Sequence, residues 1–156
     1  RMDDRECVTR FLIFSVFLPE GYDKDDFDAF LNTGMHYLNA HTELLENLKH
    51  RFTRAMQAAT RIFGNDAFRK RYTSSATRFP VNKALFESWS FNLDACNDEE
   101  LVLLEQRKEM LKDVFMKLMR ENSAFDKAVT QGTGSIARVR CRFEEIKRLI
   151  RRVLDA

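Results

Sequence analysis

The sequence predicts an all-α protein, built as a compact and mostly antiparallel array of six to seven helices. Apolar residues recur at spacings of three and four along most of the 156 residues, which is the period of an amphipathic helix. Glycine and proline are scarce, at 5 and 2 residues, whereas a fold of many strands and tight turns needs more of both. The 14 phenylalanines and an apolar content of 44% can fill the core of one domain over residues 1–156.

The first predicted helix is capped at Asp3 or Asp4, continues through "RECVTRFLIFSVFL", and ends at Pro19 and Gly21. Because it is apolar on nearly every side, we expect it to lie at the centre of the fold. A buried strand over residues 11–18 is the alternative. This longest apolar run is far too short to cross a bilayer, so we expect no membrane partner.

Two amphipathic helices are predicted next. "DKDDFDAFLNTGMHYLNAH" carries acidic residues in its first turn, where the helix dipole favours them. "TELLENLKHRFTRAMQAATRIFG" has Thr42 as a candidate N-cap and Gly64 as a C-terminal stop.

Residues 65–80 are predicted to form a loop ending at Pro80, which suits the entry to the helix "VNKALFESWSFNLDAC". In that helix Leu85, Trp89 and Leu93 recur every four residues, which predicts a buried face. We expect five apolar side chains to anchor the loop to the core: Phe79, Val81, Leu85, Phe86 and Trp89.

Three helices complete the prediction. "NDEELVLLEQRKEMLKDVFMKLMREN" reads as one long helix capped by Asn97 or Asp98, and "SAFDKAVTQ" as a short one capped by Ser123. After a break at "GTG", the segment "SIARVRCRFEEIKRLIRRVLDA" carries a continuous apolar stripe with basic residues on its other sides.

Charge is spread unevenly along the chain, although the net charge is only +2. Residues 1–50 carry 5 basic against 10 acidic side chains, and residues 84–134 carry 6 against 10. Residues 51–83 carry 8 against 1, and residues 135–156 carry 7 against 3. The pattern indicates either charge complementarity between packed helices or a basic face directed at nucleic acid.

The basic blocks are the functional signal of this sequence. Cations near the loop alternate with threonine and serine hydroxyls, a combination that suits phosphate oxygens and predicts salt-dependent binding. The candidate contact residues for DNA or a protein partner are Arg69, Lys70, Arg71, Arg78, Lys83, Arg138 and Arg142. If they form a nucleic-acid interface, Arg69, Lys70 and Arg71 should share one exposed positive surface with part of the last helix. The alternative is a solvated joint between two halves of the domain.

No motif in the sequence indicates catalysis. A Walker loop, a dinucleotide-binding glycine motif, HExxH, an HNH arrangement and a nucleophile elbow are all absent. The three histidines do not share a helical face, and the acidic pairs fall in first helical turns, so we expect no metal, no cofactor and no enzymatic activity. Three scattered cysteines without a CxxC pair predict a reduced, cytoplasmic protein.

Five separated strings, taken in order, resemble one family: "RMDDRECVTRFLIF", "DDFDAFLN", "IFGNDAFRKRY", "RFPVNKALFESW" and "TGSIARVRCRFEEIKRLI". They are similar to the helical region after the core domain of the ParB-like, DGQQR-motif family. That family includes the GmrSD-type modification-dependent restriction systems and related phage-defence proteins. The similarity covers nearly the whole chain.

The resemblance implies a place in a larger protein. In such proteins an N-terminal α/β domain carries the DGQQR motif, linked with nucleotide binding and hydrolysis, and some members add an HNH nuclease domain. This sequence contains neither motif, so no catalytic residue is carried over to it. The resemblance implies a fragment of a longer protein that supports the nucleotide-handling domain and contacts DNA or a second subunit.

Overall fold

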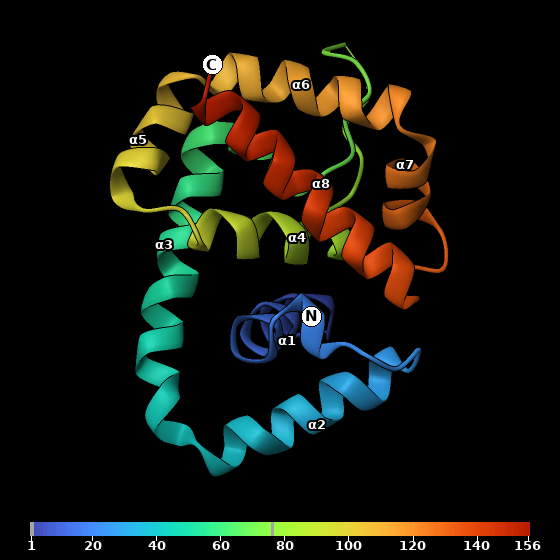
Figure 1. Cartoon of the computed structure of the whole chain (residues 1–156). Helices are drawn as coiled ribbons and strands as arrows, with labels where there is room; N and C mark the ends of the chain where they lie inside the picture. The colour runs from blue at the N-terminus through green and yellow to red at the C-terminus, as the bar shows by residue number, and fades with distance from the viewer. Residues whose placement is uncertain (1, 76) are drawn as a thin grey trace.

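The computed structural model describes residues 2–75 and 77–156, and it confirms the all-α class. Within these ranges the chain forms eight α-helices, one more than the upper end of the predicted range (Figure 1). Their bounds are α1 Met2–Phe17, α2 Phe27–Ala40, α3 Leu45–Phe63, α4 Lys83–Asp94, α5 Asp98–Gln106, α6 Lys108–Glu121, α7 Ser123–Thr130 and α8 Ile136–Leu154. Short 3-10 turns at Pro19–Gly21, Thr42–Leu44 and Gly64–Asp66 join the first elements.

Helix α1 lies at the centre of the N-terminal half, whereas the prediction placed it at the centre of the whole fold. It packs against α2, α3 and α4, and Figure 1 shows it nearly end-on between α2 and α4. Phe11, Ile13 and Phe14 are completely buried. Residues 11–17 are therefore helical, and the alternative of a buried strand is wrong.

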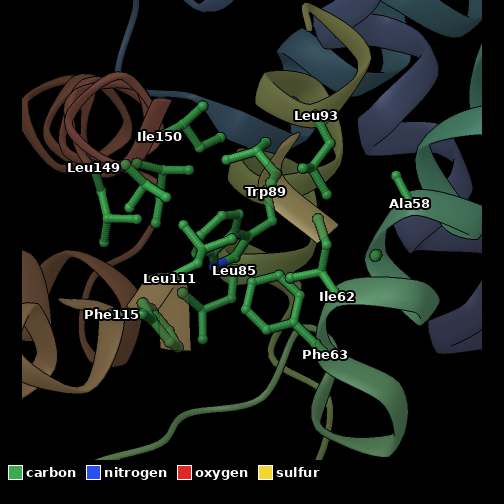
Figure 2. Close-up of a cluster of buried hydrophobic side chains, with 14 of the residues drawn as sticks. Ala58, Ile62, Phe63, Leu85, Trp89, Leu93, Leu111, Phe115, Leu149 and Ile150 are labelled. Atoms are coloured by element: carbon green, nitrogen blue, oxygen red, sulfur yellow. The ribbon is translucent and has the colours of Figure 1, made fainter. Parts of the chain in front are cut away.

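The second half is built around α4, which contacts α1, α3, α7 and α8. Leu85, Trp89 and Leu93 are buried as their spacing predicts, and Trp89 is only 1% exposed. Figure 2 shows the Trp89 ring surrounded by labelled side chains from α3, α6 and α8. The rings of Phe63 and Phe115 meet it edge-on at centroid distances of 4.8 and 5.4 Å.

The predicted long helix over residues 97–122 is wrong, because the structure divides it at Arg107. This residue has φ −99° and ψ 21°, outside the helical region. Its guanidinium donates to the carbonyl oxygens of Val153 and Leu154 at the end of α8, at 2.7 and 3.0 Å. The bend lets α5 cover α3 while α6 crosses towards α7.

The helix ends follow local chemistry, with several caps displaced from their predicted positions. Asn97 caps α5 in a reciprocal capping box with Glu100, as one of the two predicted caps. Gly64 ends α3 at φ 57°, as predicted. Asn122 rather than Ser123 caps α7, and Thr42 opens a 3-10 turn before α3 instead of capping it.

None of the helices in the described part of the chain is both long and apolar enough to cross a membrane.

Candidate interaction surface

Hydrogen bonds tie the two described parts of the basic loop between α3 and α4, residues 67–75 and 77–82, to each other and to the fold. Asn82 N–H donates to the carbonyl oxygen of Phe68 at 2.8 Å, and Arg69 and Val81 form an isolated antiparallel bridge. Phe68 holds a left-handed φ of 61°, and its ring lies 4.5 Å from the ring of Phe86. The two ends of the loop are therefore paired with each other at the start of α4.

Tyr72 fixes the middle of the loop to the C-terminal half. Its hydroxyl donates to Asp126 Oδ1 at 2.7 Å, and Arg120 donates to its carbonyl oxygen at 2.6 Å. Burial, together with the hydrogen bond to Asp126, raises the pKa of Tyr72 to about 12. The loop thus joins α3, α4, α6 and α7.

Two of the candidate cations are used within the loop. Arg69 donates to the carbonyl oxygens of Asn65 and Phe79 at 3.0 and 2.6 Å. Arg71 donates to the carbonyl oxygen of Ser74 at 2.8 Å and lies 3.6 Å from the Asp66 carboxylate. Both guanidiniums therefore close the loop on itself.

Lys83 points into acidic neighbours on α1. Its ammonium lies 3.0 Å from Asp3 and 2.5 Å from Glu6. These hydrogen bonds, first the one to Glu6, raise the pKa of Lys83. By contrast, Lys70 is half-buried and Arg78 exposed, and neither forms an ion pair within residues 2–75 and 77–156.

Arg142, predicted as a contact residue for DNA or a protein partner, is fully buried, so that prediction is wrong. Its Nε donates to Glu87 Oε1 at 2.7 Å, and its Nη1 donates to the carbonyl oxygens of Thr133 and Ala128 at 2.6 and 3.3 Å. Arg138 is half-buried and donates to the carbonyl oxygen of Gln131. Both arginines hold the α7–α8 turn.

A buried ionic network connects these positions. Glu87, at 0% exposure, bridges Arg142 on α8 and Arg10 on α1, whose Nη1 lies 2.8 Å from Glu87 Oε2. Arg10 also binds Glu6, the partner of Lys83, with Nε to Oε1 at 3.0 Å. Arg10 and Glu87 were not among the predicted site residues. The feature of the sequence that could have indicated Glu87 is its position as a carboxylate in the middle of the mainly apolar segment "ALFESWSF".

The alternating charge blocks pair across helix interfaces. Arg51 binds Asp94 at 2.6 Å, and Arg61 binds Glu105 at 3.0 Å, which links α3 to the acidic block of residues 84–134. Arg151 binds Glu100 in the same way from α8. Of the two explanations left open by the charge pattern, internal complementarity accounts for these residues.

An apolar hollow of about 670 Å³ opens between α1, α3 and the loop, and we call it the α1–loop hollow. Val8 and Val81 on its wall are 37% and 46% exposed, next to the rings of Phe52 and Phe68. The expectation that Val81 and Phe79 anchor the loop in the core is wrong, since Phe79 is 36% exposed as well. Gathered exposed apolar residues are typical of interaction surfaces.

The histidines and the other possible metal ligands are dispersed. His41 stacks on Tyr37 at a centroid distance of 4.0 Å, and its ring nitrogen lies 2.8 Å from the Tyr37 carbonyl oxygen. Throughout the described ranges, no group of three or more histidine, cysteine or acidic side chains could hold a metal ion.

Comparisons with known proteins return no match to this chain among family models, curated proteins or solved structures.

Proposed function

We propose that this chain is a non-catalytic interaction domain that holds a neighbouring nucleotide-handling domain, in a protein that resembles the GmrSD-type restriction and phage-defence systems. The α1–loop hollow is the observation that carries the proposal. Val8 of α1 and Val81 of the loop both line it and are both exposed. A protein partner that covers this wall would remove both side chains from water, which favours association.

The charges around the hollow support a protein partner over a phosphate backbone. Lys83 and Arg69 line its rim together with Asp3 and Asp4, so cations and carboxylates are interspersed there. Such a rim suits a protein surface of mixed charge, whereas nucleic-acid interfaces are strongly positive. We also propose a reducing, cytoplasmic setting, in keeping with three free cysteines of which Cys7 and Cys96 are buried.

Co-purification tests the proposal. The chain would be co-expressed with the tagged segment that precedes it in its gene, and we expect the two to purify together. Val81→Asp should release the chain, because a carboxylate would be placed in the apolar contact. Val102→Asp is the matched control, since Val102 is 54% exposed on α5 and lies outside the hollow. A gene without such a segment, or equal behaviour of both variants, would contradict the proposal.

Autonomous binding of nucleic acid is the second candidate. The observation that favours it is that Arg78 is exposed, Lys70 is half-buried, and neither forms an ion pair with another described residue. Fluorescence anisotropy of labelled duplex DNA at low and physiological salt would measure it. The Lys70→Glu/Arg78→Glu variant would be compared with the control Lys24→Glu/Lys49→Glu. The control changes two other exposed lysines, Lys24 before α2 and Lys49 on α3. We expect no binding that depends on Lys70 and Arg78. Salt-sensitive binding lost only in the first variant would establish the second candidate instead.

A further inference from the structure

A second hollow, of about 460 Å³, lies on another face of the molecule, between the turn after α1, helix α4 and helix α8. We call it the α4–α8 hollow. Its wall is mainly apolar and includes Leu18, Phe91, Phe143 and Ile150. Sites for small molecules in proteins are typically concave, mostly apolar and of this size.

Leu18 stands in a backbone conformation that is almost restricted to glycine. Its φ is 60° and its ψ 161°, and it precedes Pro19. Neighbouring hydrogen bonds hold it there, from Leu18 N–H to the carbonyl oxygen of Phe14 and from Gly21 N–H to that of Leu18. The leucine side chain is 49% exposed and forms part of the hollow's wall. Strain of this kind concentrates at binding sites, and here it presents an apolar side chain to the hollow.

Asn92 gives the hollow a buried polar group. It is 5% exposed, and its amide nitrogen donates to the carbonyl oxygens of Ser88 and Phe143 at 2.8 and 3.1 Å. No donor within residues 2–75 and 77–156 binds its amide oxygen. An acceptor fixed in this way can receive one hydrogen bond from a ligand.

The charges that line the hollow leave an excess of cations. Arg140 and Lys147 on α8 are exposed and form no ion pair with any described residue. Of the other charges, Arg151 is bound to Glu100, and Glu144 lies 3.3 Å from Arg148. Arg148 is shared with Glu145, so Glu144 is only partly compensated. The charged residues that line the hollow are therefore three cations, Arg140, Lys147 and Arg151, and two carboxylates, Glu20 and Glu144. The rim therefore favours a negatively charged group.

The neighbouring thiol is poorly suited to covalent chemistry. Cys96 lines the hollow, and burial raises its pKa to about 11, so the thiol stays protonated at neutral pH. The site is consequently suited to reversible binding.

We propose that the α4–α8 hollow binds a small amphiphilic anion, with an apolar body against Leu18 and Phe143 and a carboxylate or phosphate at Arg140 and Lys147. A donor group on such a ligand would reach Asn92. This site is separate from the α1–loop hollow, and its function does not depend on the partner proposed there.

Chemical-shift titration of the ¹⁵N-labelled chain tests the proposal, with octanoate, octyl phosphate and indole-3-propionate as probes. We expect at least one anion to shift resonances around the hollow on α4, α8 and the turn after α1. Its neutral analogue, octanol for the octyl probes or indole-3-ethanol for the indole, should bind at least fivefold more weakly. Absence of localised shifts with all three anions at millimolar concentration would overturn the proposal, as would equal binding of the neutral analogue.

Two variants separate the charged rim from the apolar wall. Arg140→Gln/Lys147→Gln should raise the Kd of the anion at least fivefold, whereas Lys49→Gln/Lys127→Gln, which removes two exposed lysines elsewhere, should leave it within twofold. Leu18→Gly should also raise the Kd while keeping the turn, because glycine adopts its backbone conformation freely. Unchanged affinity in the double glutamine variant would refute the assignment of the rim.

Discussion

At the residue scale, side chains of one chemical type take opposite roles according to their surroundings. Arg142 and Arg140 are two positions apart on α8, yet Arg142 is fully buried against Glu87 and Arg140 is exposed. The charge pattern of the last helix predicts basic sides around an apolar stripe and does not distinguish the two arginines. A guanidinium is buried only where a partner from another element meets it.

Leu18 provides a test of backbone strain. Inside a helix, a protein with alanine at a given position is more stable than one with glycine there. At the φ of 60° and ψ of 161° that Leu18 adopts, this order of stability should reverse. We expect Leu18→Gly to be more stable than Leu18→Ala by about 1 kcal/mol in urea unfolding. At Val102, in the middle of α5, we expect Val102→Gly to be less stable than Val102→Ala by about 1 kcal/mol. The same order at both positions would show that Leu18 is unstrained.

At the element scale, one carboxylate on α4 connects three helices. Glu87 binds Arg10 of α1 and Arg142 of α8, and all three side chains are buried or nearly so. Apolar periodicity identified these helices and their buried faces. It did not identify which helices meet, because a helical stripe specifies a face without specifying its partner.

Removal of Glu87 would leave two buried guanidiniums without their carboxylate. We expect Glu87→Ala to lower the free energy of unfolding by about 3–5 kcal/mol, since an uncompensated buried charge is costly. Glu105→Ala is the control, because its ion pair with Arg61 is exposed and should contribute about 0–1 kcal/mol. Chemical denaturation measures both, and similar losses would mean that the buried network contributes no more than a surface pair.

At the scale of the whole molecule, the Trp89 cluster joins α3, α4, α6 and α8 into one core (Figure 2). A second group of clusters surrounds α1. Helix α4 takes part in both, and the buried network crosses it at Glu87. The charge blocks of the sequence pair across the interfaces between these helices, which explains a near-neutral chain with strongly charged segments.

Trp89→Ala tests the core. We expect it to lower the free energy of unfolding by about 3–5 kcal/mol, the usual cost of truncating a large buried aromatic. Phe79→Ala, at a residue 36% exposed, should cost about 1 kcal/mol because less apolar area leaves contact. A melting temperature unchanged by Trp89→Ala would contradict the core described here.

The candidate site was predictable only in part. Composition and charge located the basic loop, and the described parts of this loop are bonded to each other and to α7. A nucleic-acid interface would require the cations of the loop to be exposed, yet Arg69 and Arg71 close the loop and Lys83 binds α1. Asp3 and Glu6, the partners of Lys83, precede it by about eighty positions. A sequence pattern within one helix carries no information on an ion pair between residues so far apart in the chain.

The sequence by itself determined the fold class, the buried faces of the helices and the residues Leu85, Trp89 and Leu93 of the core, because these follow from local periodicity. The tertiary structure alone decided the bend at Arg107, the burial of Arg142 with Glu87 and the two hollows. Each of these depends on contacts between residues far apart in the chain. Such contacts form only when the helices pack against one another. Whether a charged side chain is buried or a valine is exposed is therefore decided by the packed helices together.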